Sequence, residues 1–356
     1  MRFIHTADLH LAASAKEYSL AVLADIGSIA VREKAEAIVF AGDIFDSFAD
    51  AYTLRAEFAR WADELPAAIQ VIALPGNHEE LNRGMNSLSA LSFGTRVRLM
   101  TTLPLEIVTL GDTEFLCIPF QQGYLDPGSM AVPPQTAPSR VAVMHGTIAG
   151  MAYTGEGPEE EQNSFIDPSV FGRLHVCYAA LGHLHASRDK RVGETLIVYP
   201  GSARVWRKGE RGPRTVSVVD VRGGAAQHRL VPVSAAGEYR SYRIPLSLDG
   251  QCAPLDRLAN PWGQADMVSL VLTGIVDDEH AVSAVEEDLR SRYAGRVRSL
   301  EVRSEVEPVA GIAGHPAAGR FLTLLAAQEG TAPAEVIERA RMLGLTAIAG
   351  RMGGDP

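Results

Sequence analysis

The stretch IALPGNHEEL, residues 72–81, begins as an apolar run and, after a proline, presents four residues of very different chemistry. The four are Gly76, Asn77, His78 and Glu79. A short apolar run bounded by a proline is typical of a buried strand. The stretch therefore predicts a strand whose carboxyl end delivers a glycine, an amide, an imidazole and a carboxylate together.

Short β-rich runs alternate with helical patterns over the first 220 residues. The runs are RFIHTA, AIVFAG, IQVIAL, EFLCIPF, RVAVMH, CYAALG, TLIVYPG and TVSVVDV. Two apolar faces at helical spacing lie between the early runs: Leu20, Leu23, Ile26 and Ala30, and Leu54, Phe58, Trp61 and Leu65. Strands that alternate with helices predict an α/β domain with largely buried sheets.

Ligand-type side chains follow five of these runs at their carboxyl ends. They are Asp8 and His10, Asp43 and Asp46, Asn77 and His78, His145, and His183 and His185. The carboxyl ends of strands are where α/β sheets place their binding crevices. A single histidine there is usually structural, but these ends hold half of the ten histidines in the chain, which predicts a functional site.

The residue types at these ends indicate metal chemistry, because Asp, Asn and His together suit Mn, Fe or Zn better than Ca or Mg. The donors are too many for one ion with an open coordination position, and they suit two ions that share a carboxylate. Such a pair activates water and clamps both oxygens of an in-line displacement at phosphorus. Glycines at positions 42, 76 and 182 are expected to let the backbone turn sharply after the strands. The residues alone predict a two-metal phosphoester hydrolase.

The motifs DLH, GDIFD, GNHE, HG and GHLH, in this order, resemble the five motifs of the calcineurin-like metallophosphoesterases. Within that superfamily, IHTADLHL, GDIFD and YPGSARV most resemble the SbcD-type nucleases of DNA double-strand-break repair. The resemblance covers residues 1 to about 220 and implies a two-sheet α/β sandwich flanked by helices. Ala12 stands where the family usually has Gly, and Glu79 where it usually has Asp. Neither departure removes a ligand.

Carried over position by position, the resemblance implies two divalent metal ions, with manganese as the expected metal. The implied ligands of one ion are Asp8, His10 and His185. Those of the other ion are Asn77, His145 and His183, and Asp43 is implied to bridge both ions.

The resemblance also implies two catalytic residues that are not ligands. His78 is implied to stabilise the transition state and to help the leaving oxygen depart. Asp46 is implied to orient the His78 imidazole and keep it protonated, because a nearby anion favours the charged form. Glu79 is expected to brace the turn rather than to take part in the chemistry.

Charge is unevenly distributed along the chain. The net charge of −10 argues against nucleic-acid binding by overall electrostatics. Residues 188–214, however, carry eight Lys and Arg against three acids, with Trp206 among them. Such a run is usually a solvated loop or hairpin. Because it begins three residues after His185, it also predicts phosphate contacts beside the metals, by Arg204, Arg207, Lys208 and Arg211.

The pattern changes near residue 235. EYRSYRIPLSL, MVSLVLTGIV and RVRSLEVRSEV predict strands, and a helix between the last two is expected to have Asp277 as its N-cap. We predict a nuclease domain over residues 1–232, a small α+β capping domain over 235–308 and a helical partner-binding tail over 312–356. The apolar residues of the tail either fold back onto the capping unit or, as the resemblance implies, dock on an SbcC-type ABC ATPase.

The leading interpretation is a two-metal DNA nuclease, both exonuclease and endonuclease, that processes DNA ends with an SbcC-type ABC ATPase and is a homodimer. The alternative is a cytosolic phosphodiesterase acting on a small nucleotide or other small phosphodiester. A catalytically silent scaffold is a third possibility, against which the complete ligand set argues. A protein Ser/Thr phosphatase is disfavoured because GDIFDSF lacks the Arg-Gly expected after its second aspartate.

The remaining features favour a cytoplasmic protein without a membrane segment. No apolar run approaches the roughly 18 residues that a membrane span needs. MRFIHTADLH lacks the apolar segment of a signal peptide. The three cysteines show no paired spacing, which indicates reduced thiols.

Overall fold

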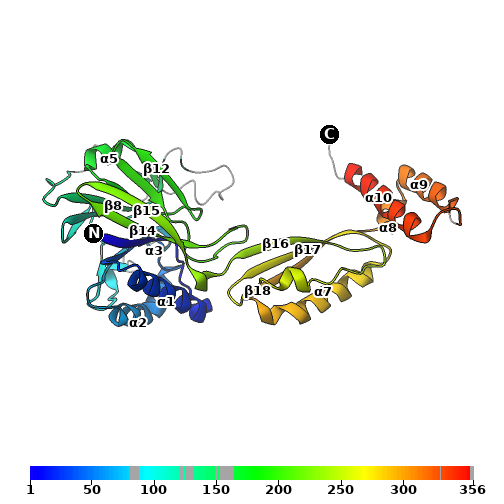
Figure 1. The fold of residues 1–356 in the computed structure, drawn as a ribbon, viewed down its shortest axis with the longest axis horizontal. Helices are drawn as coiled ribbons and strands as arrows, with labels where there is room; N and C mark the ends of the chain where they lie inside the picture. The colour runs from blue at the N-terminus through cyan, green and yellow to red at the C-terminus, as the bar shows by residue number, and fades with distance from the viewer. Residues whose placement is uncertain are drawn as a thin grey trace. The chain divides into compact units, whose positions relative to one another are not determined.

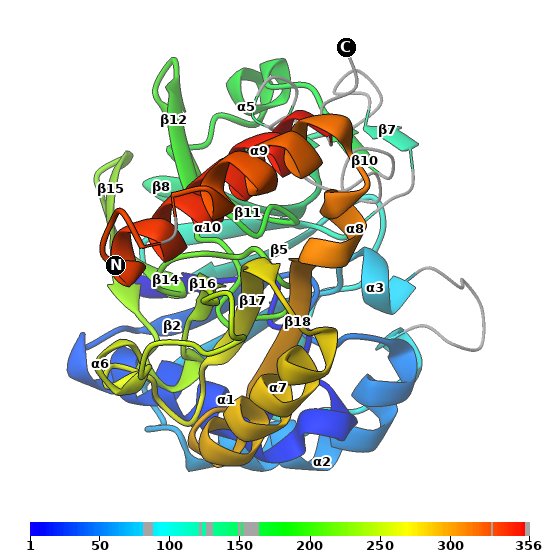
Figure 2. The same cartoon turned by 90° about the vertical axis from the view of Figure 1, so that its right-hand side faces the viewer.

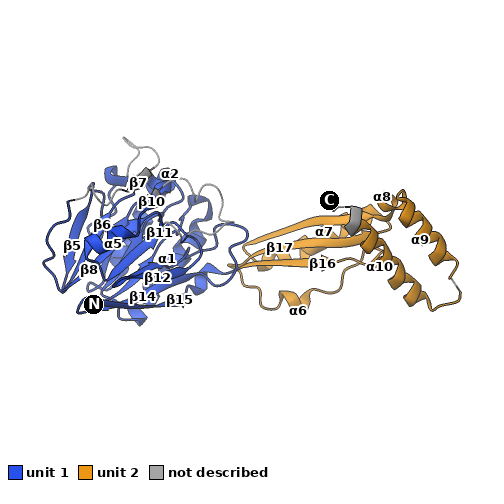
Figure 3. Ribbon diagram, turned by 90° about the horizontal axis from the view of Figure 1, so that it is seen from above, with its two compact units in different colours: residues 1–238 blue, residues 239–356 orange. Residues whose placement is uncertain are grey.

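The computed structural model describes residues 1–80, 88–120, 123–125, 131–148, 151, 164–328 and 330–352. The chain forms two compact units, residues 1–238 and residues 239–356, coloured separately in Figure 3. Within the described residues, no helix combines the length and the apolar character needed to cross a membrane.

The first large sheet of unit 1 has the strand order β15-β14-β1-β2-β3-β4. Its strands are β1 (Arg2–Thr6), β2 (Ala37–Ala41), β3 (Gln70–Leu74), β4 (Val97–Leu99), β14 (Thr215–Arg222) and β15 (Ala225–Pro232). Strands β1 to β4 are parallel, while β14 is antiparallel to both β1 and β15. The carboxyl ends of β1, β2 and β3 therefore lie at one edge of the sheet.

The second large sheet has the order β12-β13-β11-β8-β6-β5. Its strands are β5 (Glu106–Leu110), β6 (Thr113–Ile118), β8 (Ser139–His145), β11 (Tyr178–Gly182), β12 (Arg188–Val192) and β13 (Thr195–Tyr199). Its four central strands are parallel and its two edge strands are antiparallel. A small sheet adds β7 (Gly123–Leu125), β10 (Ser164–Ile166) and β9 (Thr147–Ile148).

Helices cover the outer faces of the two sheets (Figure 1). The helical segments of unit 1 are η1 (Ala13–Ala15), α1 (Lys16–Arg32), α2 (Phe48–Glu64), α3 (Asn77–Glu80), η2 (Leu88–Ala90), α5 (Ser169–Leu174) and η4 (Ser234–Ala236). Successive strand residues face opposite sides, so Ile4 joins the core under α1 and α2 while Phe3 joins the core between the sheets. Phe3 packs edge-on against Phe115 and Tyr178 of the second sheet. The expected α/β sandwich is confirmed.

All eight β-rich runs form strands, but four further strands of the large sheets lack a clear sequence signal. These are β4, β5, β12 and β15. β12, with the sequence RDKRV, shows why such a strand is hard to recognise. It lies at a sheet edge, where charged residues protect against aggregation and hide the apolar pattern of a strand. β12 pairs with β13 in a hairpin within the basic run, but only β12 is exposed, because β13 is buried along its whole length.

Unit 2 is built on three parallel strands in the order β16-β17-β18. Its elements up to residue 308 are β16 (Tyr239–Pro245), α6 (Asp256–Ala259), β17 (Met267–Val276), α7 (Glu279–Tyr293), η5 (Ala294–Arg296) and β18 (Ser299–Pro308). The expectation that Asp277 caps α7 is wrong by one residue. Asp278 accepts the main-chain N–H of His280 at 2.9 Å, whereas the carboxylate of Asp277 pairs with Arg341 at 2.8 Å.

The tail forms α8 (Val309–Ala313), α9 (Pro316–Ala326) and α10 (Ala334–Met352). Helices α9 and α10 lie side by side (Figure 2), with the ring of Phe321 against Gly344. A buried cluster joins these helices to the three-stranded part of unit 2 through Leu248, Ile275, Ile312, Ala318 and Leu345. Part of the apolar tail surface therefore folds back onto its own unit. A second set of apolar side chains stays more than half exposed, namely Leu324, Val336 and Leu343.

Candidate metal centre

The polar residues at the carboxyl ends of the unit 1 strands adopt an unusual backbone conformation. Among the described residues, six non-glycine residues have positive φ, and four of them are predicted site residues. These four are Asp8 (54°), His10 (42°), Asp43 (49°) and His183 (109°). Left-handed backbone at such residues costs about 1–3 kcal/mol each and clusters at functional sites. The fold thus holds these side chains in place at a cost in stability.

One group of ligand-type atoms comes from Asp8, His10 and His185, whose donor atoms lie within 4.8 Å of one another. All three residues are buried. The Nε2 atoms of the two histidines face each other at 3.2 Å. Both carboxylate oxygens of Asp8 accept the main-chain N–H of His183, at 2.9 and 3.0 Å, which ties β1 of one sheet to β11 of the other.

A second group comes from Asp43, His145 and His183, again with donor atoms within 4.8 Å. Asn77 joins it, because its Oδ1 lies 2.9 Å from His145 Nε2 and 3.1 Å from His183 Nδ1. The other ring nitrogen of His145 donates to the carbonyl of Ala41 at 2.8 Å.

Asp43 lies between the two groups. Its Oδ2 is 3.9 Å from His10 Nε2 and 3.3 Å from His145 Nε2. Its Oδ1 accepts the main-chain N–H of His78 at 3.0 Å. One buried carboxylate therefore reaches both groups, as a bridging ligand must.

The arrangement of donor and acceptor atoms fits cations. Nδ1 of His145 donates to a carbonyl, and its Nε2 faces the acceptor atoms Asn77 Oδ1 and Asp43 Oδ2, so this nitrogen needs a proton or a metal ion between it and them. Although burial opposes the charge, the Asp43 carboxylate raises the pKa of His145 to about 9. Burial also raises the pKa of Asp8 to about 6. The centre thus favours positive charge, which divalent ions would supply.

Two of the three predicted turn glycines are needed for a different reason from the expected one. Only Gly42 has a left-handed φ, of 91°. At Gly76 an added Cβ would lie 2.1 Å from Asp43 Oδ1, and at Gly182 it would lie 2.1 Å from the carbonyl oxygen of Ala41. These two glycines let backbone and ligands approach closely, and neither needs a left-handed φ to do so.

The structure corrects how Asp46 orients His78, but the Asp46 carboxylate stays near that ring, since the donor atoms of His10, Asp46 and His78 lie within 4.8 Å of one another. His78 Nδ1 donates to the main-chain carbonyl of Asp46 at 3.0 Å, while the Asp46 carboxylate lies 3.4 Å from His10 Nδ1. Since a carbonyl only accepts, Nδ1 of His78 carries a proton. Nε2 takes no part in this hydrogen bond. His78 lies beside the site, with its ring centroid 4.5 Å from that of His10.

Glu79 braces the turn, as expected. Its Oε1 accepts the main-chain N–H of Phe45 at 2.8 Å, and its Oε2 accepts that of Gly76 at 2.6 Å. Burial, reinforced by the Asp43 charge, raises the pKa of Glu79 to about 8. The side chain thus links the loop after β2 to the loop after β3.

The four predicted DNA-binding residues fall into two environments. Lys208 and Arg211 are exposed, and Arg207 is half-buried with its guanidinium 4.0 Å from the centre of the Trp206 ring. Arg204 is buried instead: its Nη1 donates to Ser19 Oγ at 3.4 Å, and its guanidinium lies 5.4 Å from the centre of the Tyr18 ring. Because Arg204 is buried and engaged by α1, we no longer assign it the predicted phosphate contact.

Sequence reasoning missed two residues of this site, Trp206 and Glu210. The indole of Trp206 stacks on His10, with centroids 4.0 Å apart and planes 8° apart. Glu210 Oε1 accepts from His185 Nδ1 at 2.5 Å. Although burial opposes it, the bond to His185 keeps the pKa of Glu210 below its usual range. Their only sequence signal was an aromatic and an acid inside a basic run.

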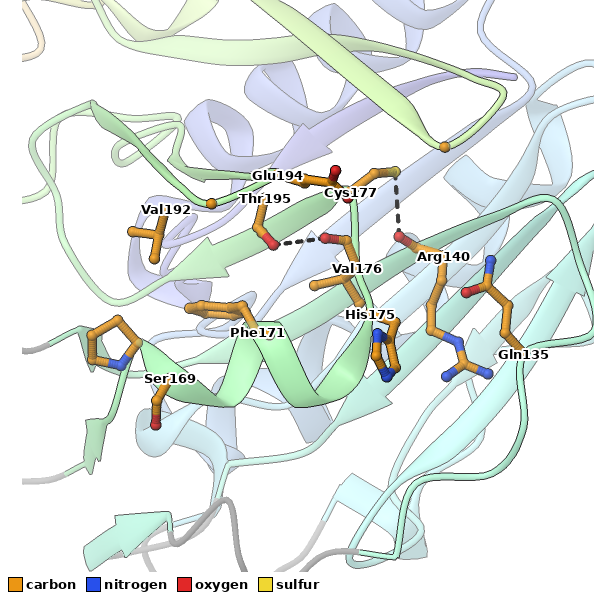
Figure 4. A pocket seen from close by; sticks show the side chains of 14 residues that line it. Gln135, Arg140, Ser169, Phe171, His175, Val176, Cys177, Val192, Glu194 and Thr195 are labelled. Carbon is orange, nitrogen blue, oxygen red and sulfur yellow. Dashed lines mark hydrogen bonds between the residues drawn. The ribbon is translucent and has the colours of Figure 1, made fainter.

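A separate cavity of about 480 Å³ lies at the amino ends of β8 and β11, away from these ligand groups (Figure 4). Thr195 Oγ1 donates to the carbonyl of Val176 at 2.7 Å, and Cys177 Sγ lies 3.4 Å from the carbonyl of Arg140. The buried guanidinium of Arg140 is paired with Glu114 at 2.8 Å. These three polar groups are thus already engaged by the protein.

The fold and the paired Asp/His groups define a class of protein. The family description of the calcineurin-like phosphoesterases matches residues 1–187. The chain belongs to this family and is a metal-dependent phosphoester hydrolase.

Two curated relatives carry the same name. The chain is 26% identical to the D subunit of the nuclease SbcCD of Rhodobacter capsulatus, over 83% of this chain and 86% of the relative. It is 24% identical to the D subunit of the nuclease SbcCD of Bacillus subtilis, over 63% of this chain and 67% of the relative. Among solved structures, a dimetal phosphatase from Danio rerio matches 65% of this chain and 96% of its own length, with 12% identity and a TM-score of 0.42.

Proposed function

We propose that this chain is a two-metal DNA nuclease that hydrolyses phosphodiester bonds during DNA end processing and repair. The observation that carries the proposal is the convergence of seven buried donor residues from five strand ends, with Asp43 within reach of both groups. The name shared by the curated relatives supports DNA as the substrate.

The proposed metal ligands divide as the two groups of side chains do. Asp8, His10 and His185 hold one ion, Asn77, His145 and His183 hold the other, and Asp43 bridges them. When bound, the two ions, proposed to be manganese, activate water and neutralise charge on the phosphate oxygens. The protein contributes surroundings of low dielectric constant, since all seven ligand residues are buried.

His78 is the proposed catalytic residue that is not a ligand. Its main-chain N–H to Asp43 and its Nδ1–H to the Asp46 carbonyl fix the ring, leaving Nε2 to meet the substrate. When both nitrogens of the positioned ring are protonated, Nε2–H can stabilise charge on the phosphorane and pass its proton to the leaving oxygen, which leaves a neutral imidazole. The Asp46 carboxylate lies 3.4 Å from His10 Nδ1 and is also near His78, where a nearby anion favours the charged imidazole.

The proposed DNA-binding side chains are Arg207, Lys208 and Arg211, which follow the site along the chain and reach the solvent wholly or in part. Trp206 links them to the centre, because it lies between the imidazole of His10 and the guanidinium of Arg207. Phosphates on either side of the scissile bond would meet these cations, which provides most of the affinity for a duplex.

The test compares three substrates: end-labelled duplex DNA, single-stranded DNA and a cyclic nucleotide, each with Mn²⁺ and with chelator. We expect Mn²⁺-dependent cleavage of DNA. In the Arg207→Gln, Lys208→Gln, Arg211→Gln variant, DNA binding should weaken and its log–log salt slope should fall by about 0.9 for each phosphate that the protein no longer neutralises. Hydrolysis of a small model ester should survive.

The matched control changes Arg32, Lys34 and Arg222 to Gln, which removes the same charges from exposed positions far from the strand ends that form the site. This control should keep the wild-type salt slope. Equal loss of DNA binding in both variants, or cleavage of the cyclic nucleotide alone, would replace the nuclease with the small-phosphodiester enzyme.

We also propose that the tail binds an SbcC-type ABC ATPase through Leu324, Val336 and Leu343, whose side chains are 62%, 55% and 57% exposed. Apolar anchors on helices suit docking into a groove. Because Leu345 and Ile312 pack on the three-stranded part of unit 2, deleting the tail would damage that core. Changing the three exposed residues to Glu should abolish ATPase capture in a pull-down and leave nuclease activity intact. Gln328→Glu with Thr346→Glu, at exposed polar positions, is the control.

A homodimer is proposed as well, and light scattering tests it.

A further inference from the structure

The segment from Ser202 to Arg211 folds back onto the candidate metal centre. Ser202 anchors its start, because its N–H donates to the carbonyl of His185 at 3.1 Å and its Oγ lies 2.9 Å from the carbonyl oxygen of Asp8. Tyr18 of α1 holds the next part, where its hydroxyl accepts the N–H of Val205 at 3.1 Å. The segment is thus fixed to the loops that carry two ligands.

Glu210 is the residue of this segment with the strongest link to the site. Its side chain and that of His185 are each only 10% exposed, and Oε1 is 2.5 Å from His185 Nδ1. Its other oxygen, Oε2, accepts the main-chain N–H of Trp206 at 2.8 Å. The indole of Trp206 in turn stacks on His10. One carboxylate therefore acts on both histidines of the Asp8 group.

The two halves of the centre differ in what holds their histidines. His145 donates its second ring nitrogen to the neutral carbonyl of Ala41, whereas His185 donates to a carboxylate. A carboxylate on the far nitrogen fixes the tautomer, aims the other nitrogen at the metal and makes it a stronger donor. A carboxylate bonded to His185 therefore affects the ion site of Asp8, His10 and His185, and not the site of Asn77, His145 and His183.

We propose that Glu210 is a positioning residue for the ion held by Asp8, His10 and His185, and that it fixes the basic segment to that same ion site. The proposal rests on the proposed function, since it assumes two ion sites. It assigns the roles by atom: Oε1 orients His185, and Oε2 holds Trp206 against His10. Binding of the ion at this site is thereby coupled to the placement of Arg207 and Lys208.

The test measures Mn²⁺ binding to the full chain by calorimetry and by electron paramagnetic resonance, without substrate. In Glu210→Gln the amide oxygen still accepts from His185, but the negative charge is lost. We expect one of the two Mn²⁺ sites to weaken by about 10–100-fold and the other to change less than about twofold. Glu210→Ala should weaken the same site further, because orientation is lost as well as charge.

Two further variants keep the test decisive. Glu194→Gln removes an exposed acid from the same basic stretch and should leave both Mn²⁺ sites unchanged. Glu210→Asp keeps the charge and should restore part of the affinity, which a purely structural role would not predict. At saturating Mn²⁺, Glu210→Gln should recover most of the wild-type turnover.

The outcomes separate this inference from the proposed function. If the wild type binds two Mn²⁺ ions and Glu210→Gln binds both as tightly, Glu210 is not a positioning residue, and the nuclease proposal stands. Equal weakening of both sites also overturns the inference. If the wild type binds fewer than two ions, the two-metal function itself fails.

Discussion

The candidate metal centre has two halves, one for each group of ligand residues, and different parts of the protein hold them in place. The half with Asn77, His145 and His183 is held by main chain: Ala41 accepts from His145, and Gly182 leaves room for that same carbonyl. The half with His10 and His185 is held by side chains of a later segment, which stack on one ring and bond to the other.

This difference teaches where the site tolerates change. Main chain at the ends of buried strands cannot move without disturbing two cores, so the Asn77 half leaves no space for an added atom. Trp206 and Glu210 belong to a segment outside the strands. Their side chains can therefore be replaced without moving the strand ends. We therefore expect substitutions to separate the two halves, except where a residue serves both.

Asp43→Asn should have the largest effect, because Asp43 reaches both halves. Losing the charge that both ions share should lower phosphodiester hydrolysis by at least about 10³-fold, equivalent to several kcal/mol of transition-state stabilisation. Metal content measured by mass spectrometry should fall below two ions per chain. Asp112→Asn, at a side chain that is 55% exposed, is the control. Two ions retained by the Asp43 variant would refute the bridging role.

His78→Ala tests a residue that belongs to neither ligand group. Removing a positioned imidazole should lower the rate of hydrolysis by about 10²–10⁴-fold. Metal content should stay nearly intact, because the ring bonds to the Asp46 carbonyl and its main-chain N–H to Asp43 survives. A variant that loses an ion together with activity would make His78 a ligand.

Gly182→Ala breaks the main-chain half. The added methyl would lie 2.1 Å from the Ala41 carbonyl oxygen, and overpacking of this kind costs about 1–3 kcal/mol. For a unit of this size, each kcal/mol lowers Tm by about 2–4 °C. Gly172→Ala is the matched control, since nothing lies within 4 Å of the new atom and the residue is helical. Equal Tm values for the two variants would show that the close approach is not needed.

Trp206→Ala tests the side-chain half more gently. An aromatic pair contributes about 0.5–1.5 kcal/mol beyond burial, so kcat/KM should fall by about 2- to 10-fold. The loss should come with weaker binding of one metal ion only, as measured by calorimetry. Trp206→Phe keeps a ring over His10 and should recover most of the activity. Unchanged metal binding in the Ala variant would mean that the stacking is incidental.

His5→Gln should have the smallest effect on activity, because it changes only how stability depends on pH. His5 is buried near Tyr178, and burial lowers its pKa to about 3. Between pH 3 and the usual value near 6.5, the unfolded chain binds a proton that the folded chain does not, so stability falls as pH falls. In urea unfolding, the slope of the unfolding free energy against pH should be smaller in the variant by up to about 1.4 kcal/mol per pH unit. His175→Asn, at an exposed histidine, should keep the wild-type slope.

Much of the fold and of the ligand set could be predicted because both leave local patterns. Buried parallel strands read as short apolar runs, and each site loop follows its strand within a few residues. The edge strand β12 could not be recognised, since its charges protect the sheet edge and hide the period. The N-cap of α7 was misplaced by one residue, because adjacent aspartates offer the same capping oxygen and Arg341 takes one of them.

The sequence by itself determined the family and the order of the ligand residues, and it brought the ligands of each sheet together, because parallel strands place their carboxyl ends at one edge. The meeting of the two sheet edges is a property of the tertiary structure. Only the tertiary structure decided what each side chain touches. Asp46 faces His10 through its carboxylate, Arg204 is buried beside Tyr18, and Glu210 reaches His185 from 25 positions along the chain. The physical reason is that strand ends are fixed by local pattern, whereas the path of a loop depends on all the packing around it.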